Sequence, residues 1–304
     1  MLSIHTNRSL LSALDGLDKT SSALAVSQER LSTGYRINSA KDDAAGLQMA
    51  SRLAAQSSGM KVAMRNTQNA TAMMQTVDSL LGQVGDTLSR LSDLAITAAD
   101  ASTTDDDRAA LGKEFNTLSQ QVWSTLNDST FAGRHLTRAI WGMSDYEPAG
   151  TMLQGPMTFQ IGDSADQTIT EDFVSGILWM NIKLLDSING GDLYADYNAH
   201  YAISAPALTS AGAANALVDK LADASKAVGA LRSQVGAFTN RLDSVYRNLQ
   251  NMTANTEAVR GKIMDVDYAD ETAVMTTHQM LMQAGTAMVK NSLSMVQMIK
   301  SLVE

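Results

Sequence analysis

Side chains that carry catalytic chemistry are few and scattered in this 304-residue sequence. The histidines stand far apart, and none belongs to the H-E-x-x-H pattern with which a helix holds zinc: His5, His135, His200 and His278. No G-x-S-x-G elbow, Walker loop or G-x-G-x-x-G turn occurs. Cysteine is absent, which removes thiolate metal sites, disulfides and cysteine nucleophiles. We therefore expect no enzyme, no cofactor and no bound metal; the alternative is an uncharacterised catalytic site in residues 140–206.

One acidic run invites a calcium reading but has a simpler explanation. Asp105, Asp106 and Asp107 are consecutive, whereas an EF-hand needs spaced ligands and a glutamate at position twelve of its loop. Aspartates are favoured in the first turn of a helix, where the backbone dipole is positive. We predict that 101–107 is a turn that ends in N-cap and first-turn acidic residues, followed by a helix from Asp106 to Leu126.

Composition and charge exclude further classes. The net charge is −9 and the sequence pI is about 4.9, so the surface repels phosphate backbones and nucleic acid is not an expected partner. No uncharged apolar run reaches the roughly 18–20 residues of a membrane-spanning helix, and no signal peptide is visible. On the bare sequence these features favour a soluble protein without a membrane partner.

Proline placement divides the chain into helical flanks and a mixed middle. The three prolines are Pro148, Pro156 and Pro206, so 1–147 and 207–304 lack the strongest helix breaker. One predicted helix, from Ala44 to Ala98, would be about 80 Å long at 1.5 Å per residue. A helix of that length needs antiparallel partners along it.

The C-terminal flank supplies such a partner. Apolar residues there alternate steps of three and four, the pattern of a coiled-coil seam. The seam runs through Leu217, Leu221, Ala224, Val228, Leu231, Val235, Phe238, Leu242, Val245, Leu249 and Met252, and Thr256, Val259, Ile263 and Val266 continue it. The fold class predicted is mainly α, with long antiparallel coiled-coil helices from both chain ends and a small β-hairpin-containing insert in the middle. In that insert we expect a strand over 157–161, bracketed by turns, and a short helix over 177–188.

Both chain ends are unusually apolar. From Glu271 to Glu304 only four residues are charged, yet apolar side chains recur at helical spacing. One intramolecular partner would not cover so much apolar surface, so we predict that the ends become buried when copies of the chain assemble. The residues predicted for this polymerisation interface are Leu10, Leu14, Leu17, Leu24, Leu31, Leu281, Met288, Met295, Ile299 and Leu302.

Several motifs resemble one family, the bacterial flagellins. The stretch L-S-T-G-Y-R-I-N-S-A-K-D-D-A-A-G-L over 31–47 resembles the flagellin signature, and L-S-I-H-T-N over 2–7 is similar to the start of a flagellin. D-V-D-Y-A-D-E over 265–271 and Q-A-G-T-A over 283–287 are similar to its C-terminal motif. The resemblance covers about three quarters of the chain. Two segments, 1–7 and 59–66, are closer to lateral (swarming) flagellins than to many polar ones, and the subtype stays open.

The resemblance implies a function and a domain plan. A flagellin is exported from the cell and polymerises into the flagellar filament for swimming or swarming, and the short middle here implies a compact type with little or no outer domain. The inner-tube helical domain would comprise 1–44 and 261–304, the outer helical domain 45–140 and 207–260, and the variable insert 141–206. A hook–filament junction protein of the flagellum remains the alternative, although that family usually has a proline after the acidic pair Asp42-Asp43.

The resemblance also assigns roles and partners. It implies a spoke that joins the inner and outer helical domains and contacts neighbouring subunits, with cap-type and close-packing residues Ile37, Asn38, Asp42, Asp43 and Gly46, for which a simple interhelical loop is the alternative. It places Arg90, Leu94 and Glu114 where a host Toll-like receptor recognises flagellins, but Ser92 stands where an arginine is usual, and an ordinary subunit contact is equally compatible. The expected partners are copies of the chain, an export chaperone, the filament cap and the hook-junction proteins.

Overall fold

The computed structural model describes residues 8–137, 152–153, 155–188 and 208–303. These residues form six helices and two short antiparallel strand pairs. They divide into two compact units, one made of residues 1–58 with 252–304 and the other of 59–251. The start motif over 2–7, two of the histidines and much of the predicted insert lie outside the described residues.

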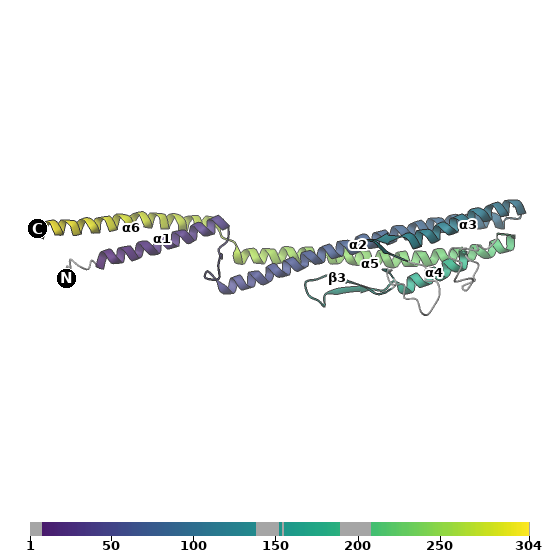
Figure 1. Cartoon of the computed structure of the whole chain (residues 1–304), viewed down its shortest axis with the longest axis horizontal. Helices are drawn as coiled ribbons and strands as arrows, with labels where there is room; N and C mark the ends of the chain where they lie inside the picture. Colours follow the sequence, from purple (N-terminus) through teal and green to yellow (C-terminus); the bar gives the residue numbers. More distant parts are fainter. Residues whose placement is uncertain (1–7, 138–151, 154, 189–207, 304) are drawn as a thin grey trace. The chain divides into compact units, whose positions relative to one another are not determined.

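The larger unit, 59–251, is built on two long helices that run antiparallel. Helix α2 (Ala44–Ala99) and helix α5 (Ala211–Met264) lie side by side over this unit (Figure 1). The Arg232 guanidinium binds the Asp78 carboxylate at 3.0 Å, and the Gln68 amide donates to the Tyr246 hydroxyl at 3.2 Å. Residue numbers along α5 therefore increase in the direction in which those along α2 decrease, so the two helices are antiparallel. The predicted partnership of the two chain flanks is confirmed for this unit.

Two shorter helices complete the core of this unit. Helix α3 (Asp105–Asp128) begins after Thr104, whose hydroxyl accepts from the Asp107 backbone N–H at 3.2 Å, while the Asp107 carboxylate accepts from the Thr104 backbone N–H. This capping box satisfies backbone donors at the helix start. The three aspartates lie in the first turn of α3, as predicted for the acidic run, but the N-cap is Thr104. Helix α4 (Val174–Ile188) begins three residues before the predicted start. Leucines, methionines and alanines of α2, α3, α4 and α5 then form one continuous buried cluster.

The strands are short and antiparallel. Strand β3 (Met157–Gln160) pairs with β4 (Thr168–Glu171), which confirms the predicted hairpin. Its Phe159 ring lies 5.8 Å from Phe238 of α5, which anchors the hairpin to the core. The sequence reading missed a second hairpin, β1 (Thr130–Phe131) with β2 (Arg134–His135), whose two-residue turn has positive φ at both positions.

The smaller unit contains an antiparallel pair formed by the two chain ends. Helix α1 (Arg8–Thr33) packs along helix α6 (Tyr268–Val303) (Figure 1). Arg30 meets Glu271 near one end of the pair, and Leu17 meets Gly285 farther along. A Cβ added to Gly285 would stand 3.2 Å from the Leu17 Cδ1 atom, so the missing side chain lets the helices approach closely.

The predicted C-terminal seam is correct only as far as Leu249. Leu249 packs on Met60 and Ala63, but Met252 and Val259 are exposed and Thr253 is buried instead. After Leu242 the inward positions advance to 245, 249 and 253, so two successive steps of four replace the expected alternation. When inward residues are repeatedly four positions apart, the inward face rotates gradually around the helix axis. The continuation of the seam through Met252 and Val259 was therefore wrong.

Candidate assembly surface and connecting segment

Helix α1 turns one apolar row toward α6 and a second row toward solvent. The row facing α6 alternates steps of three and four, through positions 10, 13, 17, 20, 24, 27 and 31. Four of the predicted interface residues belong to this row and are half-buried: Leu10, Leu17, Leu24 and Leu31. Leu14, the fifth on this helix, is exposed.

Helix α6 has the same two-sided character. Its inward row is Glu271, Met275, His278, Met282, Gly285, Val289 and Ser292, again in steps of three and four. The predicted interface residues lie on the other side: Leu281, Met288 and Met295 are 52%, 67% and 59% exposed. Ile299 and Leu302 belong to α6, but their side chains lie outside the described residues. The α1–α6 pair thus leaves an apolar surface of α6 uncovered.

Sequence reasoning missed other members of these outward rows. The additional exposed apolar side chains are Leu11, Val26, Met280, Leu293 and Met298. Sequence spacing alone does not identify them, because α1 and α6 each have large apolar side chains in both the inward and the outward row.

The α1–α6 contact also contains a buried polar layer. Arg30 Nη1 donates to Glu271 Oε2 at 3.5 Å, and Ser27 beside them is buried. The second Glu271 oxygen, Arg30 Nε and His278 Nδ1 are buried without a hydrogen-bond partner among the described residues. Such a layer favours one register of the two helices over others, as a buried polar residue does in a coiled coil.

Two connecting segments are joined within the smaller unit. Tyr35 and Asp265 form an antiparallel bridge, with Arg36 N donating to Met264 O at 2.6 Å and Val266 N to Gly34 O at 3.0 Å. The predicted spoke residues lie in the first of these segments and at the start of α2. The backbone of the spoke is therefore tied to the segment that links α5 to α6.

Two adjacent aspartates order the rest of this segment. The Asp42 carboxylate accepts from the backbone N–H groups of Asn38 at 3.0 Å and Ser39 at 2.8 Å. These bonds, that from Ser39 first, hold the pKa of Asp42 below its ordinary value. Asp43 accepts from the Gly46 N–H at 2.9 Å and so caps the N-terminus of α2.

Ile37 closes this arrangement with a buried side chain. A Cβ on Gly46 would lie 2.8 Å from the Ile37 Cδ1 atom and 2.5 Å from Asp43 Oδ2, so a larger residue there would displace both side chains. The close approach predicted at Gly46 exists, but it is made by the connecting segment rather than by another helix. All five predicted spoke residues are thus brought together by direct contacts.

The predicted receptor residues fall into two environments. Arg90 Nη2 binds Glu114 Oε1 at 2.8 Å on the surface where α2 meets α3, and this contact raises the pKa of Arg90. Leu94 is buried in the core of the larger unit. A protein that docks on this face would meet Arg90 and Glu114 but not Leu94.

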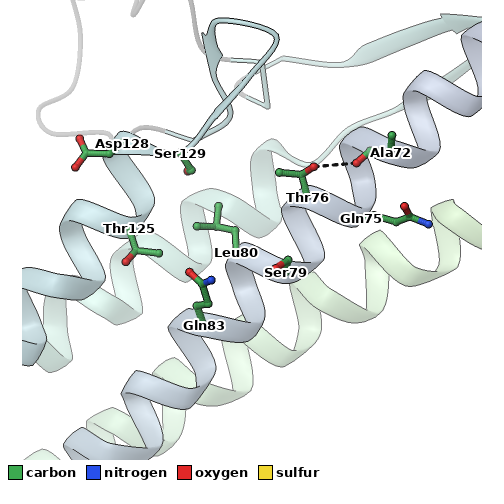
Figure 2. A pocket seen from close by; sticks show the side chains of 9 residues that line it. All are labelled: Ala72, Gln75, Thr76, Ser79, Leu80, Gln83, Thr125, Asp128 and Ser129. Carbon is green, nitrogen blue, oxygen red and sulfur yellow. Dashed lines mark hydrogen bonds between the residues drawn. The ribbon is translucent and has the colours of Figure 1, made fainter.

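The larger unit has a shallow groove between α2 and α3. Figure 2 shows Leu80 and Gln83 of α2 opposite Thr125 and Asp128 of α3, in a groove of about 620 Å³. Six of the nine residues that line it carry an amide or a hydroxyl, and Asp128 supplies the carboxylate. Among the residues that the structure describes, no three His, Asp or Glu side chains gather as a metal site, and none of the described helices is apolar and long enough to cross a membrane.

Comparison with known proteins identifies the family. Residues 4–141 match the model of the bacterial flagellin N-terminal helical region, and residues 218–303 match that of the C-terminal helical region. Flagellin A of Vibrio anguillarum is 28% identical over 377 aligned residues, with 100% of both chains covered, and polar flagellin F of Vibrio parahaemolyticus is 28% identical, with 94% of this chain and 95% of that protein covered. The solved structure of a flagellar hook-associated protein from Vibrio parahaemolyticus covers 74% of this chain and 100% of its own with a TM-score of 0.53 and 15% identity, which supports the fold alone. The chain belongs to the bacterial flagellin family, the structural subunits of the flagellar filament.

Proposed function

We propose that copies of this chain polymerise into the filament through the outward apolar faces of α1 and α6. The observation that carries the proposal is the apolar surface of α6, where Leu281, Met288 and Met295 are more than half exposed although α6 is already paired with α1. Exposed apolar patches of this kind are characteristic of protein–protein contacts.

Burial of this surface supplies the driving force. A side chain such as leucine or methionine gains about 1.5–3 kcal/mol when fully buried, so a few of them per subunit offset the entropy lost on association. A surface on one copy that packs against a different surface on the next generates an open helical polymer when the rotation between neighbours does not close a ring. Segments 1–44 and 261–304 would line the inner tube.

The spoke would transmit forces between the helical domains of the subunit. Asp42, Asp43 and Ile37 hold its backbone by hydrogen bonds and packing, and its bridge to Asp265 adds a second tie. A segment that is ordered by its own contacts can keep the same conformation in every copy of the subunit. The simpler alternative, a loop without subunit contacts, predicts no effect of surface changes here on filament shape.

The subunit is also exported and meets partners other than its own copies. The subunit leaves the cell through the flagellar export channel and functions in the extracellular filament, with the apolar face of α6 covered by an export chaperone until then. In the filament it meets the cap and the hook-junction proteins.

A host Toll-like receptor would contact the Arg90–Glu114 surface, whereas an ordinary subunit contact at this surface would be buried in the filament. A junction protein would instead be present in few copies at the hook, so its abundance in sheared filaments separates the two flagellar roles.

Charged side chains placed on the α6 surface test the interface. The triple variant Leu281→Glu, Met288→Glu and Met295→Glu is expected to abolish filaments in electron microscopy and in the sedimented fraction, because buried carboxylates without partners are costly. The larger unit should keep its helical circular dichroism and its thermal transition. The matched control, Leu281→Met with Met288→Leu and Met295→Leu, should polymerise as the original chain does. Normal filaments from the glutamate variant would exclude this surface as the interface.

A further inference from the structure

All the sulfur in this chain is thioether. The sequence has 18 methionines and no cysteine, and helix α6 alone contains six of the methionines. Any oxidant that attacks sulfur therefore acts on methionine. Which methionines react depends on their exposure.

Four methionines of α6 form an outward row. Met280, Met288, Met295 and Met298 are between 59% and 67% exposed, and at 3.6 residues per turn they fall within about a quarter turn of one another. The other two, Met275 and Met282, lie half-buried in the contact with α1. In the larger unit, by contrast, Met74 and Met180 are fully buried.

We propose that the outward methionine row of α6 is a site of reversible oxidation, in which a hydroperoxide converts the thioethers to sulfoxides and thereby blocks assembly of the subunit. The inference rests on the proposed function, because it assigns these side chains to the interface between copies. Because the row is exposed in the free subunit and buried between copies, the unassembled chain is sensitive to oxidation and the assembled chain is resistant.

The chemistry balances with hydrogen peroxide as the oxidant. A sulfur lone pair of the thioether attacks one peroxide oxygen, the O–O bond breaks, and an S–O bond forms. The hydroxyl now bound to sulfur gives its proton to the departing hydroxide, which leaves as water, while the sulfur is oxidised by two electrons and the peroxide is reduced by two. A thiol-dependent sulfoxide reductase reverses the step, since two thiols become a disulfide and the oxygen leaves as water.

Oxidation at these positions acts on the interface rather than on the fold. A sulfoxide is polar and accepts hydrogen bonds, so its burial without a donor costs free energy that a thioether does not. In the free subunit the row faces solvent, and a sulfoxide there is hydrated without penalty. Leucine at the same positions would supply a similar apolar surface without this sensitivity.

The test compares free subunits and filaments after the same treatment with hydrogen peroxide. Peptide mass spectrometry should find sulfoxide at the four outward positions in free subunits, much less of it in filaments, and intact thioether at Met74 and Met180 in both. Oxidised subunits should show a critical concentration for polymerisation at least about tenfold higher, the effect expected when a few polar groups enter an apolar interface. Treatment with methionine sulfoxide reductase and dithiothreitol should restore the original value.

A matched variant locates the effect. The variant Met280→Leu, Met288→Leu, Met295→Leu and Met298→Leu should show the same critical concentration before and after peroxide, whereas the critical concentration of Met275→Leu with Met282→Leu should rise as it does for the original chain. Oxidised subunits with mapped sulfoxides that polymerise at the original concentration would overturn the inference, and so would equal sensitivity of the four-leucine variant. If untreated chains do not polymerise at all, the proposed function itself fails, which is a different result from either.

Discussion

At the scale of single residues, Asp42 and Asp43 show how neighbouring carboxylates take different tasks. Asp43 caps a helix through one backbone N–H, while Asp42 gathers two backbone N–H groups of the connecting segment. Both roles need an acceptor close to its own backbone, which a short aspartate side chain provides and a longer glutamate does not. The identity of these residues thus follows from local geometry.

Loss of the Asp42 charge should loosen the connecting segment. In Asp42→Asn we expect faster hydrogen exchange at the Asn38 and Ser39 amides, because a neutral amide oxygen is the weaker acceptor. In the original chain the pKa of Asp42 is lowered by its hydrogen bonds. The contribution is therefore complete above the unfolded carboxylate pKa of about 4 and is lost as the pH falls through the lower folded value. NMR-detected exchange against pH measures both effects, with Asp106→Asn, an exposed change in the first turn of α3, as the control. Unchanged exchange in Asp42→Asn would show that the carboxylate does not order the segment.

At the scale of elements, the sequence predicted more of the larger unit than of the smaller one. The helix Ala44–Ala99 was predicted to within one residue at each end, because its apolar row can face only the core of the larger unit. Helices α1 and α6 each have two candidate rows, and sequence spacing alone does not say which row faces the partner. The half-buried positions of Leu17 and Leu24 and the exposed ones of Met280 and Leu281 required the structure. The spoke residues were identified by resemblance, whereas their hydrogen bonds depend on backbone geometry that spacing does not encode.

The close approach of α1 and α6 predicts opposite effects at two glycines. Gly285→Leu should destabilise the pair by about 1–3 kcal/mol, because its side chain would occupy the space filled by Leu17. Gly16→Ala, in α1, has no atom within 4 Å of the added Cβ and should stabilise α1 by about 0.5–1 kcal/mol, since alanine loses less entropy than glycine in a helix. Amide hydrogen exchange along both helices would measure the two changes. Equal protection in Gly285→Leu and the original chain would mean that the helices do not pack closely at Gly285.

At the scale of the whole molecule, the net charge and the exposed apolar surface have opposite effects on assembly. Every copy has a net charge of −9, so copies repel one another, while the outward faces of α1 and α6 favour association. Repulsion between exposed charges is screened over about 8 Å at physiological ionic strength. The apolar attraction responds instead to the type of salt, because sulfate is excluded from protein surfaces and strengthens apolar burial.

This difference predicts a specific ion effect on polymerisation. Both sodium chloride and sodium sulfate should lower the critical concentration by screening the charge, but at matched ionic strength sulfate should lower it further. The triple variant Leu281→Glu, Met288→Glu and Met295→Glu should form no sedimentable filaments in either salt. The matched control, Leu281→Met with Met288→Leu and Met295→Leu, should keep the additional effect of sulfate. Sedimentation of subunits across a concentration series in each salt measures the critical concentration directly. Coincident curves for the two salts at every ionic strength would mean that charge screening alone governs assembly, and that the apolar surface of α6 does not drive it.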